Sequence, residues 1–300
     1  MPQIITVGTI LVKAEKSAVL EPLQRIAISY PSRLDSACTD PGKLYSVTPQ
    51  DHIYPTGQIN FCADICKEIS VSRRDDNEIV IDGNYHRKSL ILHSAILMQK
   101  ALGVTTGFNI AVNADIDLRH CGLGSSASVI QGVGAAINEL YKNPFEPMEL
   151  IRYLAGNHAE EIDNDDEHLV VVQSVGGSGV CGHFDGGLII MTGKAVPIVR
   201  VRLPEDLKIV FGIPNEYTHP DANSLITKEN DVSENFEKAS EDYSREIAYR
   251  LLNEAIPELI DDNYKPMKEF IFDYRWDMGS IKNCAYAYPA IAELAEKCVI

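Results

Sequence analysis

Apolar positions in the first part of the chain follow alternating strand and helix periods. Ile79-Val80-Ile81 predicts a strand that ends at Asp82-Gly83, and a stripe of apolar residues at helical spacing follows it. We expect that helix over residues 90–102, because Gly103 is a typical helix end. Residues 108–112 then alternate between apolar and polar or small side chains, as in a half-buried strand. The pattern indicates a mixed fold of strands and helices.

A further helix is predicted after a glycine-rich turn. Apolar residues recur at helical spacing from Val129 to Tyr141, and Pro144 marks the end. Gly132 and Gly134 lower the helix propensity of this segment. We therefore expect the helix to lie close against a neighbouring backbone.

The later part of the chain changes in character. Residues 188–191 and 207–213 predict two more strands. Residues 215–237 are polar and acidic, which is typical of a long connection or a lid. Helices should follow, one with an apolar face that includes Ile247 and a last one over residues 290–297.

The turn before the 129–141 segment has the features of an anion-binding loop. Gly122-Leu123-Gly124 is followed by Ser125, Ser126, Ala127 and Ser128 at the start of the predicted helix. Glycines allow close backbone approach, and the first amides of a helix lack internal partners and carry partial positive charge. The sequence therefore predicts a phosphate site, with a serine-capped helix that holds only water as the alternative.

Gly122-Leu123-Gly124-Ser125-Ser126-Ala127 resembles the central phosphate loop of the GHMP kinases, the superfamily of galactokinase, homoserine kinase and mevalonate kinase. It departs from that pattern at Leu118, where the family usually has proline. The resemblance implies that residues 122–128 bind the phosphates of ATP and that Ser126 helps to hold Mg²⁺. It also implies an α+β fold of two domains, with a ribosomal protein S5 domain 2-like half over residues 1–200 and a ferredoxin-like half over residues 201–300.

A second segment, Pro31 to Asp40, is similar to the first GHMP motif as sugar kinases have it, although it is shorter. An arginine beside carboxylates and amides suits a polyhydroxy substrate, because carboxylates accept from hydroxyls and guanidinium binds phosphate. We expect Arg33 to act in catalysis and in substrate binding, together with Asp35, Asp40 and Asn60. The alternative is a solvated surface turn with ordinary ion pairs.

A third segment lacks the aspartate that many GHMP kinases use as a base. When the chain is aligned on Gly186-Gly187, Gly179 takes its place. His183 is the catalytic candidate in its stead, although a solvent-facing histidine is the simpler interpretation. Homoserine kinase also lacks the aspartate, and so does β-ribofuranosylaminobenzene 5′-phosphate synthase. The glycine-rich stretch of that synthase resembles the segment around Gly177 and Ser178, and we expect these two residues to bind substrate as well. The double serine favours a kinase.

A magnesium ligand is expected after a helix that starts near Pro147. In GHMP kinases a glutamate on this helix completes the metal site, and either Glu160 or Glu161 takes that role by resemblance. Mg²⁺ prefers oxygen ligands and usually takes one or two carboxylates in addition to phosphates. The family's third glycine motif, near the C-terminus, is not found in this sequence.

Composition fits a soluble enzyme. The 300 residues are 45% hydrophobic and 23% charged, with a net charge of −16 that argues against nucleic acid as a partner. Seven scattered cysteines and the lack of a leader or a membrane span predict a cytoplasmic protein. We also expect a small-molecule substrate, and a homodimer is compatible with the sequence. Three hypotheses remain open: a kinase that uses ATP and Mg²⁺, a phosphoribosyl-type transferase, and a catalytically silent nucleotide-binding protein.

Overall fold

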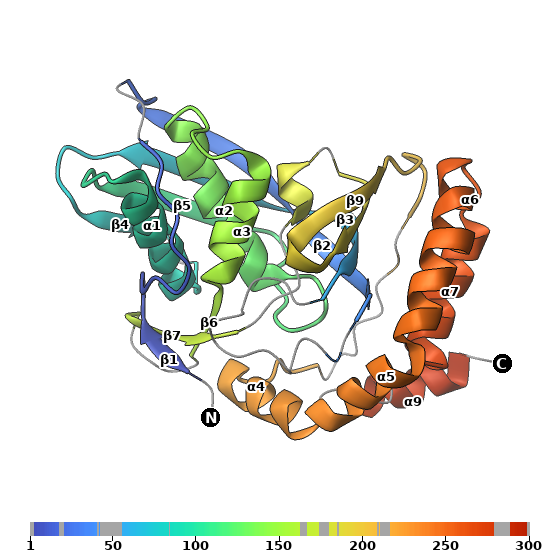
Figure 1. Cartoon of the computed structure of the whole chain (residues 1–300). Coiled ribbons are helices and arrows are strands. Elements are labelled where there is room, and N and C mark those ends of the chain that lie inside the picture. The colour runs from blue at the N-terminus through green and yellow to red at the C-terminus, as the bar shows by residue number, and fades with distance from the viewer. Residues whose placement is uncertain are drawn as a thin grey trace.

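A computed structural model describes the fold over most of the chain. Its central sheet has six strands and its smaller sheet three, and helices lie on both sides of the larger one (Figure 1). Among the described helices, none is long and apolar enough to cross a membrane. The residues described are 3–17, 21–40, 42, 56–83, 85–162, 167–173, 180–184, 186–208, 210, 217–278 and 289–298.

The larger sheet is built on two long antiparallel strands, β2 (Arg25–Cys38) and β3 (Gln58–Arg73). Their register shifts between Pro31 and Ser32, where proline has no N–H to donate to the ladder. The sheet has the order β4-β5-β3-β8-β9, with β2 paired to β3, and among the described strands only β4 and β5 pair in parallel. The strands besides β2 and β3 are β4 (Ile79–Asp82), β5 (Phe108–Ala114), β8 (Leu188–Thr192) and β9 (Val196–Val201).

Three helices pack beside this sheet: α1 (Lys88–Leu102), α2 (Ser125–Leu140) and α3 (Pro147–Gly156). They enclose the largest hydrophobic core with the apolar side chains of β3 and β5, so their burial holds the N-terminal part of the molecule together. Gly103 caps α1 in the left-handed conformation, as predicted. A small sheet of order β1-β7-β6 lies at one end, formed by β1 (Ile4–Thr6), β7 (Leu169–Val172) and β6 (Ala159–Glu161).

The elements described after β9 are all helices. They are α4 (Ala222–Asp231), α5 (Ser233–Arg250), a π-helical turn η5 (Leu251–Ala255), α6 (Ile256–Ile260), α7 (Lys265–Trp276) and α9 (Pro289–Cys298). Pro257 near the start of α6 cannot donate a backbone bond to the preceding turn, which accounts for the π-helical step. In Figure 1, α6 and α7 stand together to one side of β9.

The C-terminal helices share a second core with the sheet. Leu188 and Ile190 of β8 pack against η5, α6 and α7, whereas Ile189 and Met191 on its other face pack against α3. Strand β8 is therefore buried on both faces, which explains its uninterrupted apolar sequence. Short helical turns, η3 (Val180–His183) and η4 (Gly193–Ala195), flank it.

The mixed α+β class is confirmed, and most predicted elements are present: β4, α1, β5, α2, β8 and α9 coincide with the sequence patterns. Gly132 and Gly134 do lie in close packing, although the nearest atoms belong to the side chains of Ile69 and Leu154 and not to backbone. The predicted domain boundary between residues 200 and 201 stays a prediction.

Three predicted elements differ from the structure. No strand forms at Leu207, Lys208 or Val210, the residues of the predicted 207–213 strand that the structure describes, and the apolar side chains of Leu207 and Val210 are exposed. The part of 215–237 that the structure describes is mainly helical, because Asp221 caps α4 by accepting from the Ser224 amide. In place of the expected ferredoxin-like sheet, every element that the structure describes after β9, which ends at Val201, is a helix, since the apolar residues there recur at helical spacing.

Candidate phosphate site

The glycine loop leads directly into the N-terminus of α2, as the sequence predicts. Gly122 and Gly124 have φ values of +83° and +59°, a backbone conformation that residues other than glycine rarely adopt. Gly124 is the N-cap and no side chain caps the helix, while the space beside Gly122 is open. The first amides of α2 are therefore without a side-chain cap, which suits an oxyanion.

The loop is fastened to β2 by two backbone hydrogen bonds. The Arg33 amide donates to the Leu123 carbonyl at 3.2 Å, and the Asp35 amide donates to the Gly122 carbonyl at 3.0 Å. A Cβ on Gly124 would lie 2.9 Å from Arg33 Nε, so the arginine side chain packs directly against the loop. The Pro31–Asp40 segment and the glycine loop, which are far apart in the sequence, are thus joined in one place.

Three of the predicted substrate residues meet beside the loop. Arg33 Nη1 lies 3.3 Å from Asp35 Oδ2, and Asp35 is opposite Asn60 in the β2–β3 register. Arg33 and Asn60 are buried, which excludes the alternative of a solvated turn. Asp40 follows the end of β2, outside this group. Gly177 and Ser178 lie outside the described residues.

Helix α7 supports this group from the other side of the sheet. Arg275 donates from Nε to the Ser36 carbonyl and from Nη2 to the Asp35 carbonyl, each at 2.7 Å. The Cys38 amide donates to the Tyr274 hydroxyl at 3.1 Å. The backbone that carries Asp35 is therefore held by the C-terminal helices as well as by the loop.

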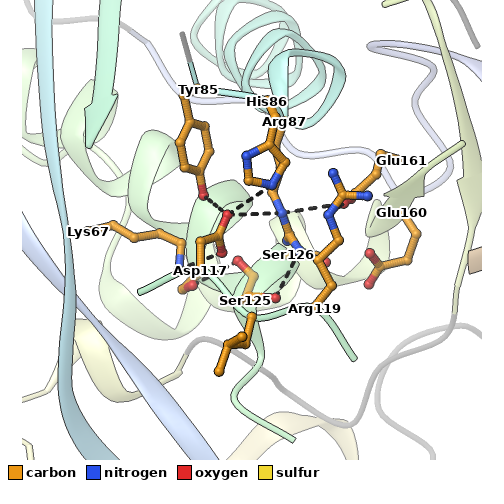
Figure 2. Close-up of polar contacts among 12 residues, drawn as sticks. Lys67, Tyr85, His86, Arg87, Asp117, Arg119, Ser125, Ser126, Glu160 and Glu161 are labelled. Atoms are coloured by element: carbon orange, nitrogen blue, oxygen red, sulfur yellow. Dashed lines mark hydrogen bonds and ion pairs between the residues drawn. The ribbon is translucent and has the colours of Figure 1, made fainter. Parts of the chain in front are cut away.

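Arg87, which the sequence analysis did not identify, lies at the centre of the site (Figure 2). It stands at the N-cap position of α1 and is fully buried. Its guanidinium donates from Nη1 to Ser126 Oγ at 2.8 Å and from Nη2 to Ser125 Oγ at 3.0 Å. Its Nε lies 3.3 Å from both Asp117 Oδ2 and Glu161 Oε1. One arginine therefore joins the loop serines to two carboxylates.

Asp117 has further partners that the sequence did not indicate as a group. Lys67 Nζ lies 3.7 Å from Asp117 Oδ1, the Tyr85 hydroxyl donates to Oδ2 at 2.8 Å, and His86 Nε2 lies 3.3 Å from the same oxygen. Burial lowers the pKa of Lys67 and of His86 and raises the pKa of Tyr85. Figure 2 shows these side chains converging on Asp117.

Glu160 and Glu161 lie on strand β6 and not near the end of a helix, because α3 already ends at Gly156 and β6 pairs with β7. Glu161 Oε1 lies 3.1 Å from Arg119 Nε in addition to its contact with Arg87. Glu160 Oε1 lies 3.2 Å from His158 Nε2. Burial raises the pKa of Glu161, whereas for Glu160 the His158, His120 and Arg87 side chains outweigh burial and lower the pKa.

These residues do not fit a protein-ligated Mg²⁺ as they are arranged. Ser126 Oγ accepts from Arg87, and a cation at Glu161 would lie against two guanidinium groups that already contact this carboxylate. Both Glu161 oxygens lack a well-directed hydrogen bond, but a metal would reach them only by displacing Arg87 and Arg119. Nowhere in the described part of the chain do three or more His, Cys, Asp or Glu side chains form a cluster able to hold a metal.

His183 lies in η3 and not at a solvent-facing strand start. Its Nε2 forms a hydrogen bond with Gln131 Oε1 of α2 at 2.9 Å, and its ring meets Tyr30 edge-on. Burial lowers the pKa of His183 to about 4. The imidazole is therefore neutral at pH 7, and its low pKa makes it a weak proton acceptor.

Lys67 and Arg87 differ in how far the sequence could have revealed them. Lys67 alternates with Ile69 and Val71, so it falls on the buried face of its strand. A lysine on an apolar face needs a buried partner of opposite charge, and a search of the sequence for such a partner could have pointed to Asp117. Arg87 is one of several polar residues before α1, and no sequence pattern distinguishes it from its neighbours.

Comparison with known proteins agrees with this geometry. Residues 89–173, which include α1, the loop and α2, match the family model of the GHMP kinases N terminal domain. This part of the chain therefore resembles the N-terminal domain of the GHMP kinases. No curated protein sequence matches the chain.

Two solved structures share the fold with TM-scores above 0.5. A mevalonate pyrophosphate decarboxylase from Streptococcus pyogenes aligns with a TM-score of 0.56 at 14% identity, over 90% of this chain and 78% of that one. A mevalonate diphosphate decarboxylase from Legionella pneumophila aligns with a TM-score of 0.53 at 11% identity, over 85% and 77%. A homoserine kinase from Cytophaga hutchinsonii is 18% identical with a TM-score of 0.33, over 45% of this chain; the chain spans only 41% of that kinase.

Proposed function

We propose that this protein is a phosphotransferase that binds the phosphates of ATP in the 122–128 loop and phosphorylates a hydroxyl group of a sugar-like metabolite. The observation that carries the proposal is the junction of the loop with β2, where backbone bonds from Arg33 and Asp35 hold Leu123 and Gly122. This junction puts a phosphate-binding backbone and a set of polar side chains in one place.

The side chains beside the loop suit such an acceptor. Asp35 and Asn60 can accept hydrogen bonds from hydroxyl groups, and Arg33 can bind the transferred phosphoryl group or an acidic substituent of the acceptor. Phosphoryl transfer depends mainly on positioning and on charge stabilisation, so a strong base is not required. His183 is too weak a base for that role, while Ser126 is the loop residue we expect to contact the transferred group.

Incubation with ATP, magnesium and a panel of sugars, sugar phosphates and polyols tests the proposal. Ser126→Ala should lower turnover by about a hundredfold or more, the size of effect seen when one donor to a transition-state oxyanion is removed. Ser233→Ala, at the start of α5, is the matched control and should leave turnover unchanged. ATP binding without turnover of any acceptor would favour a catalytically silent protein.

Release of pyrophosphate from phosphoribosyl pyrophosphate would instead identify the phosphoribosyl-type transferase. The same loop would then hold the pyrophosphate group. A cytoplasmic location, a small-molecule substrate and a homodimer belong to the proposal as well, and an acidic chain of net charge −16 is compatible with them.

A further inference from the structure

Within the proposed function, we infer that Arg87 takes the place of a protein-bound magnesium ion, so that the loop serines bind phosphate as hydrogen-bond donors. The inference concerns which cation stands between the loop and the acidic residues. It rests on the proposed function only in assuming that the 122–128 loop binds a phosphate.

Arg87 fills the space between the loop and the carboxylates. Its two terminal nitrogens reach one serine each, at 2.8 and 3.0 Å, while its Nε faces Asp117 and Glu161. The side chain is completely buried, so it is a fixed part of the site and contacts ligand only through the serines. A planar guanidinium can donate to two acceptors at once in fixed directions. A spherical metal ion with bound waters would hold its ligands in a different geometry.

The hydrogen bonds determine what the serine hydroxyls can offer. A hydroxyl has one proton to donate and two lone pairs. Since Arg87 donates to both Oγ atoms, each has less lone-pair density for a metal, and each proton can point to another acceptor. A positive donor also polarises the hydroxyl, which strengthens its own donation. Ser125 and Ser126 are thus prepared to bind an oxyanion and poorly prepared to ligate Mg²⁺.

Basic side chains already pair with the carboxylates around the loop. Lys67, Arg87 and Arg119 contact Asp117 and Glu161 within 4 Å, and Glu160 contacts His158. A dication in this network would face three fixed positive charges. An anion at the loop, in contrast, would meet a helix N-terminus backed by Arg87. The nucleotide can still carry Mg²⁺ on its phosphates without a ligand from the protein.

Calorimetry with tripolyphosphate and with ATP, in excess EDTA and in excess magnesium, tests the inference on the full chain. We expect dissociation constants that agree within about threefold between the two conditions; a loss of about tenfold or more in EDTA would overturn the inference. Such a magnesium requirement would leave the proposed function intact. No binding in either condition would overturn both.

Glu161→Gln separates the two arrangements further. If Glu161 ligates magnesium, this change should weaken binding about tenfold or more in magnesium, and that result would overturn the inference. If Arg87 is the cation, affinity should stay the same or increase, because a negative charge near the phosphate is removed. A thermal melt with and without EDTA checks that the variant is folded.

Arg87→Lys keeps the charge and removes the two-pronged contact. We expect binding of tripolyphosphate to weaken by about tenfold in EDTA, because only one serine can then be held; unchanged affinity would count against the inference. Arg74→Lys is the matched control, since Arg74 makes a comparable two-pronged contact with Asp76 at 2.7 and 2.6 Å on a surface turn. That variant should bind tripolyphosphate as the unaltered chain does.

Discussion

Lys67 shows how single side chains depend on one another in this site. Only 1% of the residue is exposed, and its ammonium group faces Asp117 from the middle of β3. Burial lowers the pKa of Lys67, while the Asp117 charge opposes that shift. The lysine is tolerated because the carboxylate lies close by, in the loop after β5, beside Tyr85 and Arg87.

Replacing Asp117 and replacing Lys67 should therefore change the free energy of unfolding by different amounts. Asp117→Leu leaves Lys67 buried beside Arg87 without its counter-charge, so we expect a loss of about 3–5 kcal/mol in the free energy of unfolding. Lys67→Met should cost less, because Asp117 keeps Arg87, His86 and Tyr85 as partners. Urea denaturation of both variants measures this difference. A larger cost for Lys67→Met than for Asp117→Leu would contradict the interpretation.

At the scale of elements, α2 connects the loop to the core. Its N-terminus carries the serines, and its middle passes close to β2 and β3 at Gly132. The sequence alone predicted α2, its glycines and the preceding loop, because those features are local: periodicity, propensity and turn chemistry. It failed for Leu207, Lys208 and Val210, the described part of the strand predicted over residues 207–213, since an apolar run forms a strand only where a neighbouring strand offers hydrogen bonds.

Gly132→Ala tests the close packing of α2. A Cβ there would lie 2.4 Å from Ile69 Cδ1 and 3.0 Å from Tyr30 Cγ. We expect the change to destabilise the protein by about 1–3 kcal/mol through overpacking, despite the better helix propensity of alanine. Adding Ile69→Val removes the clashing Cδ1 and should recover part of the loss. Thermal denaturation of the single and double variants measures this, and a stabilised single variant would refute the packing argument.

At the scale of the whole molecule, buried histidines connect distant segments. His93 of α1 accepts from the Gly8 amide at Nδ1 and its Nε2 lies 2.8 Å from the Asn157 carbonyl, so it joins the N-terminal segment, α1 and the end of α3. Both contacts require a neutral ring with the proton on Nε2. Burial lowers the pKa of His93 to about 4, as it does for His183.

These two groups predict how stability depends on pH. In the unfolded chain these two histidines bind protons near pH 6.5, whereas in the folded chain they do so only near pH 4. The free energy of unfolding should therefore be greatest above pH 6.5 and fall with decreasing pH, by up to about 1.4 kcal/mol per pH unit for each histidine. Urea denaturation between pH 7.5 and about 5 measures this.

His93→Gln provides the control for that slope. It should be less stable than the unaltered chain at pH 7.5, since the two backbone contacts are disturbed, but its stability should fall less steeply with acid. An unchanged slope in the variant would show that His93 does not account for the pH dependence.

The sequence by itself determined the glycine loop, the helix behind it, the strands β4, β5 and β8 of the central sheet and the likeness to the GHMP kinases, because each is encoded in neighbouring residues. Only the tertiary structure decided what surrounds the loop. Arg87, Lys67, Asp117 and Glu161 come from four separate segments, and the cost of burying a charge brings them together only once the chain is folded. The cation between the loop serines and the carboxylates is therefore a property of the packed molecule and not of any motif.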